Sequence, residues 1–168
     1  MNAFANAPSD SFVLLHLAGR RFALPANIVA ELAPPVRLHA FPHTSPLLTG
    51  VIFRRGRIVP VFDAERALYG KSSLAHRFYL IARHESGDGA ELGAIPVDGE
   101  CELVAGFPEA APADQPSYIR GEIPVGGQSV AVLDLSALLH AQVARMRSTE
   151  AAPVPHESNA AIPEVRRP

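Results

Sequence analysis

The sequence predicts a mainly β protein built from two similar β units that pack against each other. Three observations predict this fold class. Short apolar runs alternate with Gly-containing turns along most of the chain. Apolar residues make up 48% of the 168 residues, which is enough for a packed core. The sequence also matches itself at an offset of 71 residues, which takes Gly50 to Gly121 and indicates an internal duplication.

Ten apolar runs have the length and the flanking turn signals of β-strands. They are Phe12–Leu17, Arg21–Leu24, Ile28–Leu32, Leu48–Phe53, Arg57–Phe62, Phe78–Arg83, Glu91–Ile95, Cys101–Val104, Tyr118–Ile123 and Ser129–Leu133. Short hairpin turns are predicted at Ala18-Gly19, Arg55-Gly56 and Gly126-Gly127, because Gly tolerates the positive φ that such turns need. A longer Gly-rich loop is predicted at 84–90.

Two short helices are predicted after strands. Asp63 can accept a hydrogen bond from the first turn of a helix over Ala64–Tyr69, and Gly70 stands at its C-terminal stop. Asp134 has the same relation to Leu135–Arg147, where apolar residues recur on one helical stripe. Both helices are therefore expected to follow a strand and pack on the β core.

The duplication sets the predicted domain organisation. We expect a flexible N-terminus over 1–10, one domain over 11–147 and a flexible, Pro-rich tail over 148–168. Within the domain, subdomain 1 is predicted at about 11–70, subdomain 2 at about 77–139 and the C-terminal helix at about 135–147. Each β unit is small for a core of its own, so the two are expected to form one cooperative unit.

Composition argues against several functional classes. A formal net charge of −2 and a pI near 6.4 give no general attraction to nucleic acid. The chain has one cysteine, which excludes an intrachain disulfide. No apolar run approaches the roughly 20 residues that cross a bilayer, and the N-terminus lacks the features of a secretory signal. A cytoplasmic protein without direct membrane insertion is therefore expected.

Candidate catalytic and metal-binding residues have simpler explanations. Asp63 and Asp134, one in each repeat, follow the plan of an aspartic protease, but the residues after them do not match and capping explains both. No carboxylate or Cys pair completes a zinc site with His39 and His43. Cys101 lies between two glutamates, which raise rather than lower the pKa of a thiol. No enzyme activity, metal or cofactor is predicted.

The hairpin turn Arg54-Arg55-Gly56-Arg57 is the most informative surface feature. Its counterpart in the second repeat is Val125-Gly126-Gly127-Gln128, and Gly-Gly is a low-strain choice for such a turn. The arginine at Arg55 brings no backbone benefit, but its guanidinium can bind a partner's carboxylate. Two interpretations follow, a solvated turn or a binding site.

Several motifs in order resemble those of CheW-like domains. The stretch Gly50–Asp63 (GVIFRRGRIVPVFD) resembles the family's G-V-x-N-L-R-G-x-x-x-P-V-x-D segment. Val29-Ala30-Glu31-Leu32 resembles its V-x-E-[VI] strand, Gly93 to Asp98 its G-L-x-V-D, and Ile119 to Asp134 its closing I-x-G…V-x-L-L-D. The likeness covers about 12–140.

The resemblance implies two SH3-like five-stranded β-barrels packed side by side, and an adaptor rather than an enzyme. Family members couple the cytoplasmic tips of methyl-accepting chemoreceptors to the regulatory domain of a CheA-type histidine kinase, in receptor arrays on the inner face of the membrane. Carried over, Arg55 and Gly56 belong to the N-L-R-G motif, and Arg54 precedes them. Val29, Glu31 and Leu32 match the partner-binding strand.

This sequence departs from the family pattern at three places. Phe53-Arg54 replace the usual Asn-Leu, Ala64-Glu65 replace Leu-Arg, and Gly99-Glu100 stand where an apolar residue usually follows. The departures favour an adaptor of a divergent chemosensory pathway, such as pilus motility. Two alternatives are a homologue that titrates the kinase without coupling a receptor, and a small-barrel nucleic-acid-binding protein.

Overall fold

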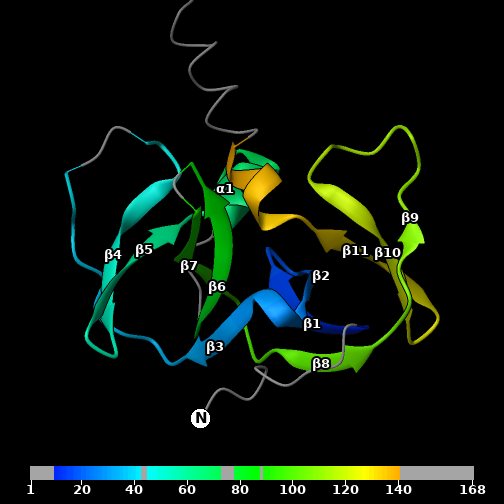
Figure 1. Cartoon of the computed structure of the whole chain (residues 1–168), viewed down its shortest axis with the longest axis horizontal. Helices are drawn as coiled ribbons and strands as arrows, with labels where there is room; N and C mark the ends of the chain where they lie inside the picture. Colours follow the sequence, from blue (N-terminus) through cyan, green and yellow to red (C-terminus); the bar gives the residue numbers. More distant parts are fainter. Residues whose placement is uncertain (1–9, 43–44, 73–77, 88, 141–168) are drawn as a thin grey trace, which may run out of the picture.

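The computed structural model describes residues 10–42, 45–72, 78–87 and 89–140, which form a mainly β molecule with two curled sheets (Figure 1). In chain order the elements are β1 (Ser11–Leu17), β2 (Arg20–Pro25), the 3-10 turn η1 (Ala26–Ile28), β3 (Val29–Ala33), β4 (Leu48–Arg54), β5 (Arg57–Phe62), α1 (Ala64–Tyr69), β6 (Phe78–Ser86), β7 (Gly89–Val97), β8 (Glu102–Ala105), β9 (Glu109–Ala110), β10 (Ile119–Val125) and β11 (Gln128–Leu133). Residues 135–140 are helical. The predicted fold class, two SH3-like barrels in a mainly β chain, is confirmed.

All ten predicted strands are present, with ends that shift by a few residues. The predicted loop at 84–90 is wrong, because β6 and β7 stay paired up to Ser86 and Gly89. Strand β9 was not predicted, since two residues among prolines carry no alternating pattern. The predicted flexible ends, and residues 141–147 of the C-terminal helix, lie outside the described residues.

Two sheets form the molecule, and their strand orders correspond. One sheet runs β3-β6-β7-β5-β4, and the other runs β8-β1-β2-β11-β10-β9. The offset of 71 residues takes β4 and β5 onto β10 and β11 residue for residue, and Arg20–Pro25 onto residues 91–96 of β7. The first five strands of each sheet are therefore equivalent, and the internal duplication is visible in three dimensions.

The structure corrects the predicted subdomain bounds. Hairpin β1–β2 comes from the first repeat but pairs with β8 and β11 of the second. Hairpin β6–β7 comes from the second repeat and pairs with β3 and β5 of the first. The barrels are therefore not contiguous units at 11–70 and 77–139, because the repeats have exchanged their N-terminal hairpins. Val61 pairs with Ala94 and Val132 pairs with Ala23, both between parallel strands. The two pairs occupy equivalent positions, where an exchanged hairpin meets the other repeat.

Among the described residues, three apolar clusters form the core. The largest combines buried side chains of both repeats, among them Leu15, Leu24, Leu80, Ile95 and Leu138. A second cluster lies within the β3–β7 sheet and a third within the sheet that contains β1 and β10. The cluster also draws on both barrels, with Leu15 and Leu24 from one sheet and Leu80 and Ile95 from the other, so apolar burial holds the two barrels together.

Both predicted helix caps are confirmed. The Arg66 backbone N–H donates to Asp63 Oδ1 at 2.8 Å, and Gly70 ends α1 with a φ of 74°. The Ala137 backbone N–H donates to Asp134 Oδ1 at 2.9 Å. Each aspartate thus satisfies a backbone donor that the first helical turn leaves unpaired.

Candidate functional site

The site is built around the turn that joins β4 and β5. Arg55 has a φ of 49° and Gly56 a φ of 74°, which is the left-handed pair of a type I′ hairpin turn. The corresponding turn in the other barrel, Gly126-Gly127, has φ values of 57° and 76°. The first turn therefore has the same backbone conformation, with Arg55 at a position where glycine is unstrained. A non-glycine residue in this left-handed conformation costs about 1–2 kcal/mol.

A β-bulge aims Glu31 at this turn. The pairing of β3 with β6 shifts between Val29, which lies opposite Ala82, and Glu31, which lies opposite Ile81. Such a bulge redirects the side chains that follow it. Val29 is buried in the core shared by the two barrels, whereas Glu31 lies at the mouth of the β3–β7 barrel beside Val59 and Ile81.

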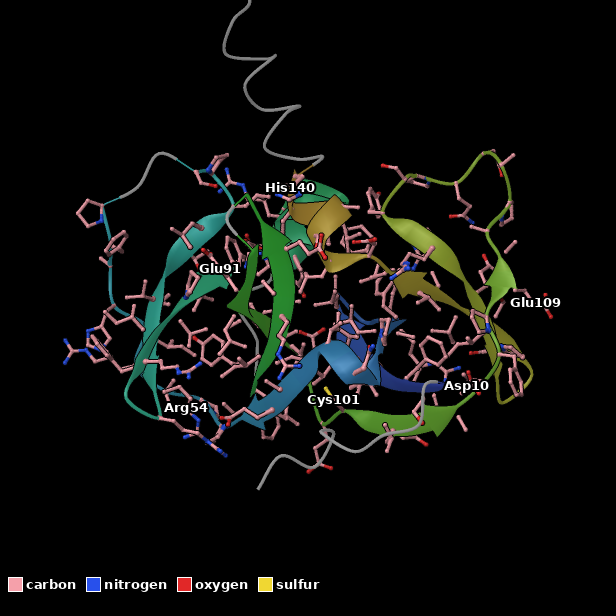
Figure 2. All side chains as sticks on the ribbon, viewed as in Figure 1. Asp10, Arg54, Glu91, Cys101, Glu109 and His140 are labelled. Carbon is pink, nitrogen blue, oxygen red and sulfur yellow. The ribbon has the colours of Figure 1, made fainter. Side chains whose placement is uncertain are left out.

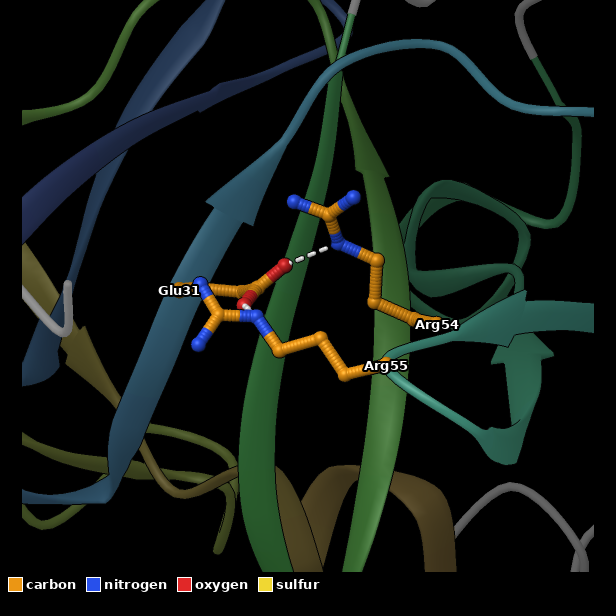
Figure 3. A network of polar contacts seen from close by, with 3 residues as sticks. All are labelled: Glu31, Arg54 and Arg55. Atoms are coloured by element: carbon orange, nitrogen blue, oxygen red, sulfur yellow. Dashed lines mark hydrogen bonds and ion pairs between the residues drawn. The ribbon is translucent and has the colours of Figure 1, made fainter.

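Glu31 pairs with both arginines of the turn (Figure 3). Arg54 Nε contacts one carboxylate oxygen, and Arg55 Nε lies 2.8 Å from the other. The Glu31 side chain is 11% exposed, whereas Arg54 is 31% and Arg55 53% exposed. A carboxylate this deeply buried needs compensating charge, and two guanidinium groups supply it.

This three-residue cluster joins the two edges of one sheet. Strands β3 and β4 are the end members of the order β3-β6-β7-β5-β4, so they do not hydrogen-bond to each other within the sheet. The Glu31 contacts link β3 to the end of β4 and to the turn after it. We call this set of Glu31, Arg54 and Arg55 the clasp. In the other barrel the equivalent of Glu31, Glu102, is exposed, and glycine and valine replace the arginines.

Beside the clasp lies an open pocket of about 460 Å³. Its floor includes Val59, Ile81 and Leu92 of the barrel interior, and its rim carries Arg57, Arg83 and Glu91 in addition to the clasp. Both clasp contacts of the arginines are made by Nε, so the Nη groups are not bound by Glu31. This rim can therefore donate hydrogen bonds to an anionic group from outside.

The predicted partner-binding residues separate into two sets. Arg54, Arg55, Gly56 and Glu31 come together in or beside the clasp. Val29 is 3% exposed and packs in the core, so its side chain is not part of the exposed surface around the clasp, and its place in a partner-binding strand stays a prediction. Leu32 is half-buried and packs against the same core.

Sequence analysis also missed an exposed apolar pair on the opposite face of the β4–β5 hairpin. Phe53 and Ile58 face each other across β4 and β5, and they are 58% and 61% exposed. The Phe53 ring packs edge-on against His39, with ring centroids 5.1 Å apart. The signal was present, since the strand alternation that buries Ile52 and Val59 turns Phe53 and Ile58 outward.

The other chemical candidates resolve to structural roles. Asp63 and Asp134 each accept a hydrogen bond from their own helix, as described above. Burial raises the pKa of the Cys101 thiol to about 11, which agrees with the predicted direction but comes from desolvation rather than from the neighbouring glutamates. Within the described residues, no three His, Cys, Asp or Glu side chains gather as a metal site. The same part of the chain has no helix long and apolar enough to span a membrane.

The described residues thus define a class of small β proteins with two barrels of equivalent strand order, and this chain adds a charged clasp at one hairpin. A family model for the CheW-like domain matches residues 11–143. The chain belongs to the CheW-like domain family. The scaffolding protein TtCheW from Thermoanaerobacter tengcongensis has a similar crystal structure, with a TM-score of 0.65 and 20% identity over 79% of this chain and 90% of that one. No curated protein matches the chain.

Proposed function

We propose that the chain is a non-enzymatic adaptor that couples methyl-accepting chemoreceptors to a CheA-type histidine kinase. Membership of the CheW-like domain family supports a scaffold role in chemotaxis signalling. The matched solved structure is itself described as a scaffolding protein. In such a role the chain performs no chemistry, and it alters kinase activity through contacts that differ between receptor states. Its place would be in the cytoplasm, at receptor arrays.

One observation carries the proposal, namely the arginine at position 55. The second repeat shows that the turn forms with Gly126 in this place, so the backbone does not require Arg55. The arginine adopts a left-handed conformation, and half of its side chain remains exposed beside a pocket with an arginine-rich rim. An exposed guanidinium in a fixed orientation is a common anchor in protein interfaces.

The variant Arg55→Gly tests this role. It places glycine where the other barrel has Gly126. The change relieves the backbone strain, which favours folding, and removes an ion pair with Glu31 worth about 0–1 kcal/mol, which opposes it. Glu31 keeps Arg54. We therefore expect the melting temperature to stay near that of the unmodified chain, while binding to the kinase regulatory domain and to a receptor tip weakens about tenfold or more.

Separate pull-downs against the two partners, with quantified affinities, provide the measurement. Lys71→Ala is the matched control, because it removes one positive charge from an exposed position outside the clasp. If Arg55→Gly binds both partners like the unmodified chain, Arg55 belongs only to the clasp. Binding to the kinase without the receptor would support the kinase-titrating alternative, and binding to neither by the unmodified chain would refute the adaptor function.

A further inference from the structure

The mouth of the β3–β7 barrel carries an excess of positive charge. Four arginines and two glutamates line the pocket beside the clasp, namely Arg54, Arg55, Arg57, Arg83, Glu31 and Glu91. Figure 2 shows Arg54 and Glu91 in the half of the molecule that this barrel forms, and Glu109 in the other half. The chain as a whole has a net charge of −2, so the charge at this mouth has the opposite sign and attracts anions locally.

These arginines keep donors that no carboxylate of the described chain uses. Among the described residues, Arg57 and Arg83 form no ion pair, and both are exposed. Arg54 and Arg55 each contact the clasp carboxylate through Nε, so it does not bind the outer N–H groups of their guanidiniums. A guanidinium has five N–H donors. Each arginine of the rim can therefore bind an acceptor that comes from solution.

The clasp holds two of these guanidinium groups in place before any ligand arrives. Arg54 and Arg55 reach the same carboxylate, so their guanidinium groups lie close together (Figure 3). A single oxyanion can therefore contact both from the solvent side. The left-handed backbone of Arg55 costs stability, and strain of this kind is common at binding sites. Because the two side chains are already ordered, less conformational entropy is lost on binding.

The floor of the pocket is apolar, which suits a small organic molecule better than a lone ion. Val59 and Ile81 belong to the core cluster of this barrel, and Leu92 packs against that cluster. The volume of about 460 Å³ lies in the range of small-molecule pockets. An apolar floor below a cationic rim fits a molecule that has an apolar body and one anionic group.

We propose that this pocket binds a small organic phosphate, with the phosphate on the arginine rim and the apolar body on the floor. A phosphate monoester carries a charge of about −1.5 to −2 at neutral pH, which balances the two excess positive charges of the rim, whereas a carboxylate supplies only one. Guanidinium forks also match the geometry of phosphate oxygens. Glu91 at the rim can accept a hydrogen bond from a hydroxyl or amino group of the ligand. Such a site goes beyond the proposed adaptor function, because it gives the chain a ligand of its own.

Phenyl phosphate is a probe that has both parts, and calorimetric titration of the full chain at neutral pH measures its affinity. We expect saturable one-to-one binding with a dissociation constant of about 1 mM or below, which is the range for a molecule of this size. Inorganic phosphate lacks the apolar body, phenol lacks the charge, and benzoate carries one charge instead of two. Each of these three should bind about tenfold more weakly or worse. In NMR spectra, phenyl phosphate should shift the backbone amide signals of Ala30, Ile81 and Leu92, which line the pocket.

Substitutions at the rim and in the pocket locate the site. Arg57→Gln with Arg83→Gln removes the two arginines outside the clasp, and should weaken phenyl phosphate binding about tenfold or more. Ala30→Leu keeps every charge but fills part of the pocket, and should abolish binding. The control, Arg37→Gln with Lys71→Gln, removes the same charge from exposed positions outside the pocket, and should bind like the unmodified chain. A melting transition like that of the unmodified chain shows that each variant is folded.

Absence of saturable binding by the unmodified chain would overturn the proposal. So would equal binding of phenyl phosphate and inorganic phosphate, because the arginines would then hold an ion without using the pocket. Equal binding of benzoate, or a rim variant that binds like the control, would also overturn it. Amide shifts at Arg20 and Arg21 would place the ligand in a different pocket. If Ala30→Leu does not fold, the rim variant and its control decide the question. No kinase or receptor takes part in these titrations, so a negative result leaves the adaptor proposal standing, and a failed adaptor test leaves the phosphate site standing.

Discussion

Gly50 and Gly121 occupy the same position in the two repeats, and close backbone packing explains both. A Cβ atom on Gly50 would lie 2.4 Å from the His39 carbonyl oxygen, and one on Gly121 would lie 2.4 Å from that of Glu109. In each barrel a neighbouring segment pairs with the strand beside this glycine: His39 pairs with Val51, and Ala110 pairs with Gly121. Glycine at these positions is therefore required by contact between two backbones, which cannot easily move apart.

We predict that Gly50→Ala and Gly121→Ala each lower the free energy of unfolding by about 1–3 kcal/mol or more, because the added methyl group overlaps a carbonyl. Chemical denaturation with an unchanged m-value measures the effect. Gly99→Ala is the control, since a Cβ there has no atom within 4 Å. Equal effects at all three positions would contradict the packing argument.

At the level of single residues, the ion-pair partner of Arg55 could not be predicted from the sequence. The comparison of the two turns singled out Arg55, and the family motif singled out Glu31. Their contact was not predicted, because it depends on the bulge after Val29 that turns Glu31 toward the barrel mouth. A shift of one residue in strand pairing reverses which face a side chain occupies, and periodicity alone does not reveal it.

At the scale of elements, Glu65 connects α1 to the hairpin β1–β2. The Ala18 backbone N–H in the hairpin turn donates to Glu65 Oε1 at 2.7 Å, and the next N–H, that of Gly19, donates to Asp98 Oδ2 at 3.1 Å. Glu65 is buried, at 7% exposure. Glu65, which departs from the family pattern, therefore has a structural role in this chain. It holds the exchanged hairpin β1–β2 to α1 of the first repeat, to which the hairpin belongs in sequence.

We predict that Glu65→Ala lowers the free energy of unfolding by about 1–3 kcal/mol, because a charged acceptor is lost and a backbone donor is left unpaired. Glu65→Gln keeps a side-chain oxygen and should recover part of the loss. Hydrogen exchange at the Ala18 amide measures the local effect, which should be faster exchange in Glu65→Ala. The exposed Glu85→Ala is the control, and exchange at Ala18 that is unchanged in Glu65→Ala would refute this role.

At the scale of the whole molecule, buried acidic groups predict a loss of stability at alkaline pH. Burial raises the pKa of Cys101 from 9.0 to about 11, and it also raises the pKa values of Tyr69 and Tyr79 above 10.0. The folded chain favours the neutral form of all three, so the unfolded chain loses these protons first as pH rises. The stability that these neutral groups contribute is fully present below their unfolded pKa values, and it declines as pH rises through about 9 to 11.

Denaturant titrations at a series of pH values test this prediction. We expect the free energy of unfolding to fall between pH 9.0 and about 11, and to fall less steeply in Cys101→Ala, which removes the thiol. At neutral pH, where the thiol does not titrate, the same variant measures the stability that is lost with the packing of the Cys101 side chain. A slope that is the same with and without Cys101 would show that the thiol is not the cause.

The exchange of hairpins between the repeats is the part of the fold that the sequence did not reveal. Alternation and turns correctly gave the strands, and the offset of 71 residues correctly gave the duplication. Neither signal states which strand pairs with which. The parallel pairs β2–β11 and β5–β7 join segments far apart in the chain, and apolar strands of two similar repeats are chemically alike. The choice between self-contained and exchanged barrels therefore rests on tertiary packing.

A chain cleaved between Lys71 and Phe78 distinguishes these two arrangements. In the structure the first piece contributes β1 and β2 to a sheet whose other strands belong to the second piece, and the second returns β6 and β7. We predict that the cleaved pieces remain together through gel filtration, and that each piece isolated in denaturant fails to melt cooperatively after refolding alone. Mixing the refolded pieces should restore one transition, because the largest core cluster needs side chains from both. Two pieces that separate and melt independently would instead support contiguous units at 11–70 and 77–139.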